Sequence, residues 1–578
     1  MAIDPVRREL IKNALITIAD NMIMQVVRTS RSTVVKNSLD FSASICDAQG
    51  NTVAQGLALP GHLGATMPAL AACLRLYEGR LRPGDILANN DPYSGASHLN
   101  DIFMFAPVFS GGRVIAYLSL VIHHTDMGGR VPGCNATDST EIYQEGLRLP
   151  PLLFDEAGVP NETAFRILEA NVRMPERMLG DIRAQIAALT AGVAAFEMLL
   201  AEQGASVIET YMADLIAYAE ALTRASIAAL PDGTATFVDY NDDDGTGGDP
   251  VRLKVRLTIR GDEIEADFTG TSPQTSGATN PNFWFTASLT YAALRTIMPM
   301  DLPTNAGFYR PIRLIVPEGS FLNPRFPAPV GARGQSGYRL RSLVLGALAQ
   351  LVPGRIPACT GGSEFSIVIA GRDPADEPFL MLEYHNVTGH GGGPATDGQD
   401  AGPFCLGNLA NVPVEVQEAE NPVLIEEYAF IPDSAGPGEF RGSLGIARQY
   451  RLLDGEALLQ VRSDRQKFPP YGLFGGDAGG PGRTFLAPAG GQLEPIPAKV
   501  IRQISAGEVY RVEMPGSGGY GPAVRRDPAR VAEDVRQGKL SIAHAARHYG
   551  VCCDAGGKVD AEATRRLRAA MAETTEEA

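Results

Sequence analysis

The sequence predicts a mixed α/β (α+β) protein with several domains. Its 578 residues are enough for three or four units of ordinary size. Hydrophobic residues make up 44% of the chain, which argues against a disordered or fibrous protein. Segments with apolar residues at helical spacing are interspersed with short alternating segments typical of strands, so both kinds of element are expected.

Changes in composition divide the chain into five segments. Residues 1–160 are expected to form an α/β region that begins with a long amphipathic helix and continues with short strands. Residues 161–230 are rich in Ala, Leu, Glu and Met, which predicts packed helices. The other three segments are a β-rich unit with an internal helix at 342–352, a Gly/Pro-rich β unit and a helical C-terminal segment, at residues 231–360, 361–526 and 527–578.

Charge and cysteine content narrow the class of protein. The 66 acidic and 50 basic residues leave a net charge of −16, which argues against nucleic acid and anionic membranes as partners. Seven scattered cysteines without CxxC spacing indicate neither a disulfide framework nor a cysteine zinc site, so a cytoplasmic protein is expected. The N-terminus lacks the features of a signal peptide, and the most apolar runs are too short to cross a membrane.

The most suggestive polar residues lie between residues 90 and 129. NDPYSGASHLND is followed, after two apolar strands, by HHTDMGG, and with His62 four of the eight histidines would lie near this locus. His98 and Asp101 are three residues apart, so a turn would bring them to the same side. His123 and His124 end an apolar strand, where neighbours point to opposite faces, so only one of them should face a site.

Two neutral imidazoles and one or two carboxylates are suitable ligands for a divalent metal. Such a metal lowers the pKa of a bound water and supplies hydroxide near neutral pH. The alternative interpretation is that these residues are hydrogen-bonded polar groups of the core and its loops. The residues alone leave both interpretations open.

Other motifs do not carry a function. GSGGYG at 516–521 lacks the strand and helix of a dinucleotide site, and no P-loop motif occurs. NDDDGTGGD at 241–249 has Leu253 where a calcium loop needs Glu, so it is expected to be a solvated hairpin loop. KLSIAHAARHYGV at 539–551 has the spacing of a helix-turn-helix, but its acidic surroundings favour a docking helix. Cys134 is expected to have a packing role.

Several stretches resemble the hydantoinase B/oxoprolinase family. NDPYSGASHLNDIFMFAPVF, HHTDMGG and TEIYQEGLRLPP look like the core of that family, and SLDFSASICDAQGN, PGEFRGSLGIARQYR and SDRQKFPPYGLFGG extend the likeness over nearly the whole chain. Ser97 and Asn100 depart from the Thr and Pro that are more usual in the family. Neither of these two changes affects a residue that the family uses as a metal ligand.

The resemblance implies a metal-binding subunit of an ATP-dependent cyclic amide hydrolase that acts on a small hydantoin, lactam (caprolactamase) or oxoproline ring. It places the metal ligands at Asp40, His98, Asp101 and His123. It leaves three further polar residues for supporting the ligands or moving protons, namely His124, Asp126 and Glu141. One divalent transition metal is expected, with Zn²⁺ before Mn²⁺ or Fe²⁺, although the ligand types do not decide among them.

The resemblance also implies a hydantoinase A-like partner subunit that binds ATP and Mg²⁺, in an A2B2 heterotetramer. In the hydrolases of this family the partner phosphorylates the amide oxygen, and metal-bound water in the B-type subunit then opens the ring. An unactivated amide is a poor electrophile, which explains why ATP is needed.

Two other functions remain as alternatives. One is a subunit of an ATP-dependent ketone carboxylase of the acetone or acetophenone type, whose ATP turnover would depend on bicarbonate. The other is a non-catalytic scaffold for the ATPase partner, for which replacement of His98 would leave the activity of the complex intact.

Overall fold

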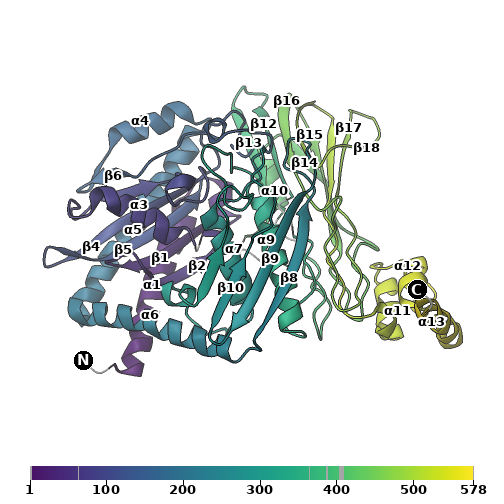
Figure 1. The fold of residues 1–578 in the computed structure, drawn as a ribbon. Coiled ribbons are helices and arrows are strands. Elements are labelled where there is room, and N and C mark those ends of the chain that lie inside the picture. Colours follow the sequence, from purple (N-terminus) through teal and green to yellow (C-terminus); the bar gives the residue numbers. More distant parts are fainter. Residues whose placement is uncertain (1–2, 63, 363–364, 386–387, 403–408, 577–578) are drawn as a thin grey trace. The chain divides into compact units, whose positions relative to one another are not determined.

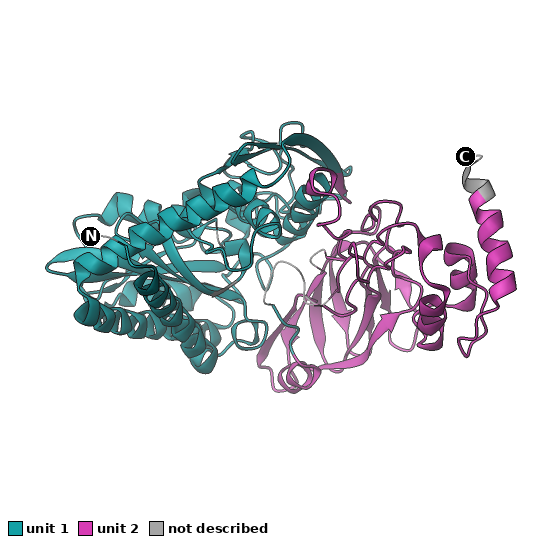
Figure 2. Cartoon of the chain, turned by 90° about the horizontal axis from the view of Figure 1, so that it is seen from below, with its two compact units in different colours: residues 1–238, 243–347, 406–412 teal, residues 239–242, 348–405, 413–578 magenta. Residues whose placement is uncertain are grey.

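The computed structural model describes the chain except residues 1–2, 63, 363–364, 386–387, 403–408 and 577–578. It confirms the mixed α/β architecture (Figure 1). The chain forms two compact units, shown in different colours in Figure 2. Unit 1 comprises residues 1–238, 243–347 and 406–412, and unit 2 comprises residues 239–242, 348–405 and 413–578. The division into five segments stays a prediction.

A seven-stranded sheet forms the middle of unit 1. Its order is β2-β1-β5-β4-β3-β6-β7, and every neighbouring pair is antiparallel. The strands are β1 (Phe41–Asp47), β2 (Thr52–Ala58), β3 (Ile86–Asn89), β4 (Asp101–Ser110), β5 (Arg113–His123), β6 (Leu152–Glu156) and β7 (Val159–Pro160). The two longest strands, β4 and β5, lie side by side in the interior of the sheet.

Nine helices have described residues in unit 1, together with three short 3-10 turns. The helices are α1 (Pro5–Thr29), α2 (Thr33–Lys36), α3 (Thr66–Tyr77), α4 (Glu162–Asn171), α5 (Pro175–Gln203), α6 (Ala205–Ala228), α7 (Phe283–Arg295), α8 (Ala306–Tyr309) and α9 (Gly334–Leu351), which continues into unit 2. The turns are η1 (Pro60–His62), η2 (Pro92–Ser94) and η3 (Ile142–Gln144). The predicted helix at 342–352 is therefore the second half of a longer one.

Helices cover both faces of the seven-stranded sheet. Met104 and Leu120 belong to the core that α1 and α5 complete, whereas Phe103 and Val121 belong to a second core beneath α3. Successive residues of a strand point to opposite faces, and cover on both faces explains why β4 and β5 are apolar almost without interruption. Figure 1 shows α5 running along this sheet.

Two helices, α1 and α5, are long and apolar enough to cross a membrane by length and composition. No such segment was expected from the sequence. In the structure the two helices pack against each other, and both contact the seven-stranded sheet. Buried residues such as Leu15, Met22 and Phe196 face that core, and this packing accounts for the apolar composition of both helices.

A smaller sheet of unit 1 has the order β11-β10-β9-β8, with the strands β8 (Gly233–Asn241), β9 (Val251–Arg260), β10 (Glu263–Asp267) and β11 (Ile312–Ile315). β8, β9 and β10 lie in the segment that the sequence predicts to be β-rich. β10 pairs with β11 in parallel, and α7 and α8 lie between them in the chain. The loop between β8 and β9 is exposed at residues 246–249, in agreement with the predicted solvated hairpin, whereas Asp242 and Asp244 are buried and accept backbone hydrogen bonds.

Unit 2 contains two antiparallel sheets that share one core. One sheet consists of β12 (Ser366–Arg372), β13 (Pro378–Glu383), β16 (Glu456–Arg462) and β19 (Lys499–Ser505). The other consists of β14 (Val423–Ile431), β15 (Gly445–Leu452), β17 (Arg483–Ala487), β18 (Glu494–Pro495) and β20 (Val509–Glu513). Helix α10 (Val414–Glu420) precedes β14. Ile369 of the first sheet and Tyr450 of the second belong to the same buried cluster, as expected for sheets packed face to face.

The C-terminal segment of unit 2 is helical, as predicted. The turn η4 (Ala523–Arg525) leads into α11 (Pro528–Arg536), α12 (Ile542–Tyr549) and α13 (Ala561–Glu576). Val531 and Tyr549 belong to a small core of their own. Buried ion pairs join Asp534 of α11 to Arg441 and Arg526 of the same unit.

Candidate metal centre

Three buried side chains of unit 1 converge on one point. His98 Nε2 lies 3.0 Å from Asp101 Oδ1 and 3.1 Å from His123 Nδ1, and the last two atoms are also 3.1 Å apart. Ligand atoms placed about 2.1 Å from a tetrahedral metal lie roughly 3.4 Å apart. The described residues thus contain one group of three side chains with the spacing of a metal site, and all three are at most 3% exposed.

The hairpin of β4 and β5 explains two of these positions. Asp101 is the first residue of β4 and His123 the last of β5, and the antiparallel register pairs them directly. Residues that are directly opposite point to the same face of a sheet. His98 joins them because the Asp101 amide donates to the His98 carbonyl, which closes a turn just before β4.

Asp40 lies at the edge of this group. It precedes β1, and its carbonyl accepts the amide of His123, because β1 pairs with β5 on the other side. Its carboxylate is buried and lies 3.9 Å from His123 Nδ1 through one oxygen, whereas the other oxygen has no hydrogen-bond partner among the described residues. An unpartnered buried carboxylate oxygen next to three candidate ligands fits a fourth ligand.

His62 also belongs to the cluster, although the sequence did not predict it as a ligand. Its Nε2 lies 3.6 Å from Asp101 Oδ2 and 3.9 Å from Asp40 Oδ1, and its Nδ1 lies 3.0 Å from the Ser42 hydroxyl. The ring is 2% exposed. His62 is therefore placed to contact both carboxylates.

Electrostatics favours the ligand forms of His98 and Asp101, whereas burial raises the pKa of the Asp40 carboxyl. Burial lowers the pKa of His98 to about 3, with a smaller contribution from the nearby Arg333. Burial alone would raise the pKa of Asp101, but His98, His62 and Arg333 outweigh it and hold the pKa of that carboxyl well below its usual range. A neutral imidazole and an ionised carboxylate are the forms that bind a metal.

Arg333 holds the other side of the Asp101 carboxylate. Its guanidinium donates to Asp101 Oδ2 at 2.8 Å and to the Ser97 hydroxyl at 2.6 and 2.9 Å, and it lies 4.4 Å from the centre of the Phe285 ring. These contacts leave Asp101 Oδ1 directed at the two histidines. Arg333 was not predicted from the sequence, because 232 residues separate it from Asp101 and no motif joins them.

The three residues predicted to support catalysis lie elsewhere. His124 is buried, and neither ring nitrogen has a hydrogen-bond partner among the described residues. Asp126 accepts hydrogen bonds from the Gly133 amide and from Arg173, whereas Glu141 is exposed. The alternation expected between His123 and His124 is observed, in that His123 alone joins the cluster. The roles of His124, Asp126 and Glu141 in proton transfer stay predictions.

Two further buried groups lie close to this locus in the chain. Cys134 belongs to the hydrophobic core, and its thiol accepts the amides of Met127 and Gly129. Glu145, which lies in the stretch TEIYQEGLRLPP but was not predicted as a site residue, is 1% exposed and accepts the amides of Val330 and Gly331 through one oxygen. Burial raises the pKa of its carboxyl to about 8, because these two hydrogen bonds only partly offset the loss of solvent.

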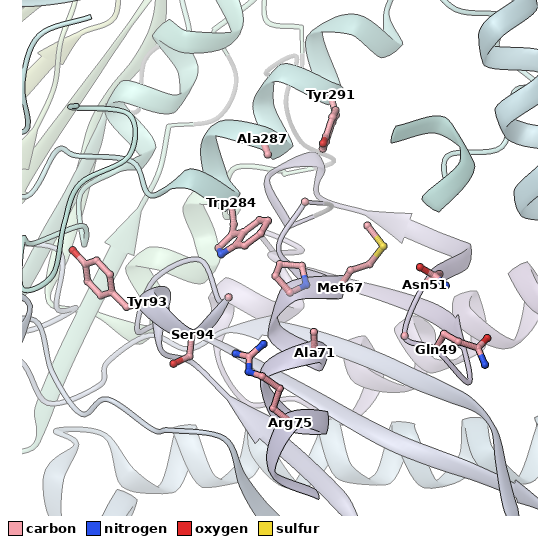
Figure 3. Close-up of a pocket in the computed structure, with 14 residues that line it drawn as sticks. Gln49, Asn51, Met67, Ala71, Arg75, Tyr93, Ser94, Trp284, Ala287 and Tyr291 are labelled. Atoms are coloured by element: carbon pink, nitrogen blue, oxygen red, sulfur yellow. The ribbon is translucent and has the colours of Figure 1, made fainter. Parts of the chain in front are cut away.

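A pocket of about 460 Å³ lies beside the segments that carry the cluster (Figure 3). Trp284, the only tryptophan of the chain, and Tyr291 of α7 form part of its wall, opposite Met67 and Arg75 of α3. The next residue after Trp284 is Phe285, whose ring contacts Arg333. The pocket therefore shares helix α7 with the surroundings of Asp101.

Comparisons with known proteins show the family to which the chain belongs. The model of the family Hydantoinase B/oxoprolinase matches residues 4–523. The B subunit of a putative D-/L-hydantoinase from Pseudomonas sp. strain NS671 is 30% identical over 98% of this chain and 98% of its own length. The crystal structure of an ATP-dependent caprolactamase from Pseudomonas jessenii is 31% identical and superposes with a TM-score of 0.92, over 98% of this chain and 100% of that chain.

A second solved structure shows how widely the fold is shared. Nucleotide-free acetone carboxylase superposes with a TM-score of 0.91 over 99% of this chain and 84% of that chain, at 19% identity. At this identity the likeness concerns the fold alone. The family match and the two relatives at 30% and 31% identity extend over almost the whole sequence, and the chain belongs to the Hydantoinase B/oxoprolinase family.

Proposed function

We propose that this chain is the metal-binding subunit of an ATP-dependent hydrolase of cyclic amides. The observation that carries the proposal is the convergence of His98 Nε2, Asp101 Oδ1 and His123 Nδ1 within 3.1 Å in a buried position. Burial removes these polar groups from water, and a bound metal would offset that cost. Two relatives that match over almost their full length are named as part of a hydantoinase and as a caprolactamase, which supports cyclic amides as the substrate class.

The residues of the site have different roles in this proposal. His98, Asp101 and His123 would hold one divalent metal, with Asp40 as a fourth ligand, and this set suits Zn²⁺, with Mn²⁺ or Fe²⁺ as alternatives. Such a metal supplies Lewis-acid activation and a nucleophile near neutral pH. Arg333 orients Asp101. All four ligand residues are buried, so bulk water has little access to them.

The ATP-binding step is proposed to belong to a partner subunit. The chain has no P-loop motif, and the hydantoinase relative is itself named as one subunit of a larger enzyme. Phosphorylation of an amide oxygen converts it into a leaving group, so an ATP-binding partner of the hydantoinase A type would supply the activated substrate. We propose an A2B2 assembly in the cytoplasm.

The function is tested by reconstitution. The chain is combined with an ATP-binding partner, and ATP hydrolysis and ring opening are measured with hydantoin, caprolactam and 5-oxoproline. We expect ATP turnover that depends on one of these rings and is lost in His98→Ala, because the variant lacks a metal ligand. His548→Ala is the matched control, since this partly exposed histidine of unit 2 lies outside the cluster.

The other outcomes identify the alternatives. ATP turnover that requires bicarbonate and a ketone would show a carboxylase. Full activity of His98→Ala in a folded complex would indicate that the chain is a non-catalytic scaffold for the ATPase partner. Elemental analysis of the parent and of the His98→Ala/His123→Ala double variant completes the test, with about one transition metal per chain expected in the parent and none in the variant.

A further inference from the structure

We infer that Glu145 is a positioning residue for the metal centre and that it acts through Arg333. The inference rests on the proposed function, because it takes Asp101 as a metal ligand. The two amides that Glu145 accepts belong to Val330 and Gly331 and not to a candidate ligand. The effect of Glu145 passes through the backbone segment that carries Arg333.

Glu145 anchors the chain just before Arg333. The side-chain oxygen Oε1 accepts the amide of Val330 at 2.9 Å and that of Gly331 at 2.7 Å. The approach is close, because a Cβ added at Gly331 would lie 3.0 Å from this oxygen. Two hydrogen bonds from consecutive amides to one buried carboxylate oxygen fix both the place and the orientation of this backbone.

The anchored segment positions the guanidinium of Arg333 beside Asp101. Arg333 follows Gly331 by two residues, and its amide donates to the Val330 carbonyl, so the segment is a closed turn. The guanidinium then reaches Ser97 and Asp101 Oδ2. If the turn were released, Arg333 would no longer be held in register with Asp101, and the carboxylate could rotate away from the histidines.

The second oxygen of Glu145 indicates which feature matters. Oε2 is buried and has no hydrogen-bond partner among the described residues. Both described hydrogen bonds are therefore made by Oε1, and a glutamine in the same place would retain this acceptor. Metal affinity that is retained in Glu145→Gln but lost in Glu145→Ala would show that the anchoring of residues 330–331 matters, and not the acidic group as such.

Another residue of unit 1 offers a matched control. Asp85 is also 1% exposed, and it accepts the amides of Arg82 and Ala157, each at 2.7 Å. It precedes β3, whereas the cluster lies where β4 begins and β5 ends. Asp85→Ala removes the same kind of backbone anchor without touching the Arg333 segment.

The experiment measures metal affinity in the full-length chain, by competition between bound Zn²⁺ and a chromogenic chelator. The variants are Glu145→Ala, Glu145→Gln, Asp85→Ala, Arg333→Met and the double variant Glu145→Ala/Arg333→Met, each checked for folding by circular dichroism. If Glu145→Ala does not fold, Glu145→Asp replaces it in both the single and the double variant, because its shorter side chain cannot reach both amides.

We expect Glu145→Ala to lose about 10- to 100-fold in Zn²⁺ affinity, as is common when a residue that orients a metal ligand is removed. Glu145→Gln and Asp85→Ala should stay close to the parent. The double variant should lose no more than Arg333→Met alone, because the two residues act in series.

Three results would overturn the inference. They are parent-like affinity in Glu145→Ala, an equal loss in Asp85→Ala, and additive losses in the double variant. A parent chain that binds no metal would overturn the proposed metal centre itself, and that result is distinct from the other three.

Discussion

Glu145 is a buried acid, and its charge in the folded chain depends on pH. Burial raises the pKa of its carboxyl from the ordinary value of 4.5 to about 8. A carboxyl whose pKa is higher in the folded than in the unfolded chain binds more protons in the folded state. Its contribution to stability is therefore complete below pH 4.5 and is lost as the pH rises through about 8.

A comparison of Glu145→Gln with the parent tests this dependence. The amide that replaces the carboxyl cannot ionise, so the variant lacks the pH-dependent contribution but keeps the acceptor oxygen. We expect the melting temperature of the metal-free parent to fall, relative to that of the variant, as the pH is raised from 5 to 9, with most of the change below pH 8. Parallel curves over this range would contradict the raised pKa.

Single residues also show how far the sequence could predict the site. His98 and Asp101 lie within one turn, and His123 follows a recognisable strand, so local spacing was enough to gather them. Arg333 and Glu145 depend on contacts across 232 and 185 or more residues, which no local pattern records. Asp126 and Glu141 are near the cluster in sequence, but their side chains lie in other surroundings, because nearness in sequence beyond one turn does not determine direction.

Among the elements, the hairpin of β4 and β5 determines the geometry of the site. Its register pairs Asp101 with His123 at one end and Ser110 with Arg113 at the other. Gly111 and Gly112 form the two-residue turn with φ of 58° and 77°. Such left-handed pairs match the twist of the adjoining strands, which explains the glycines.

Two glycine substitutions compare the turn of the hairpin with Gly128, which lies beyond the end of β5. A Cβ at Gly112 meets nothing within 4 Å, so Gly112→Ala should cost only the left-handed conformation, about 1–2 kcal/mol of the free energy of unfolding. A Cβ at Gly128, which also has a positive φ, would lie 1.9 Å from the Asn171 carbonyl oxygen. We therefore expect a larger loss in Gly128→Ala, measured by urea denaturation, and retention of metal in Gly112→Ala. Equal losses of stability in the two variants would contradict the close contact expected at Gly128.

For the whole molecule, the important feature is that every candidate ligand lies in unit 1. Asp40, His98, Asp101 and His123 belong to the sheet of that unit or to the turns that precede its strands, and unit 2 has a separate core. A ligand that binds only the folded state of one unit stabilises that unit by mass action. The metal should thus act on one unit of the molecule.

Calorimetry tests this separation. Removal of the metal with a chelator should lower the melting temperature of one thermal transition, and a second transition, assigned to unit 2, should stay where it is. The His98→Ala/His123→Ala variant serves as the control, because the chelator should shift neither of its transitions. A common shift of both transitions in the parent would show that the units unfold together.

For the whole molecule, the sequence predicted the class of fold but not the division of the chain into two units. Alternation and helical spacing identified strands of both sheets of unit 1 and the helical stretch that became α4, α5 and α6. They did not show that β11 joins β10 in parallel, or that residues 239–242 and 348–405 belong to the same unit. Those assignments depend on pairings between distant segments, for which a single sequence carries no local signal.

The pocket beside α7 gives the isolated chain an optical reporter. Because Trp284 is the only tryptophan, all tryptophan emission of the 578 residues originates at one wall of that pocket. The adjoining ring, Phe285, lies under the guanidinium that holds Asp101. A change in fluorescence on adding a metal or a small molecule would therefore need no label and could be assigned to a single place in the structure.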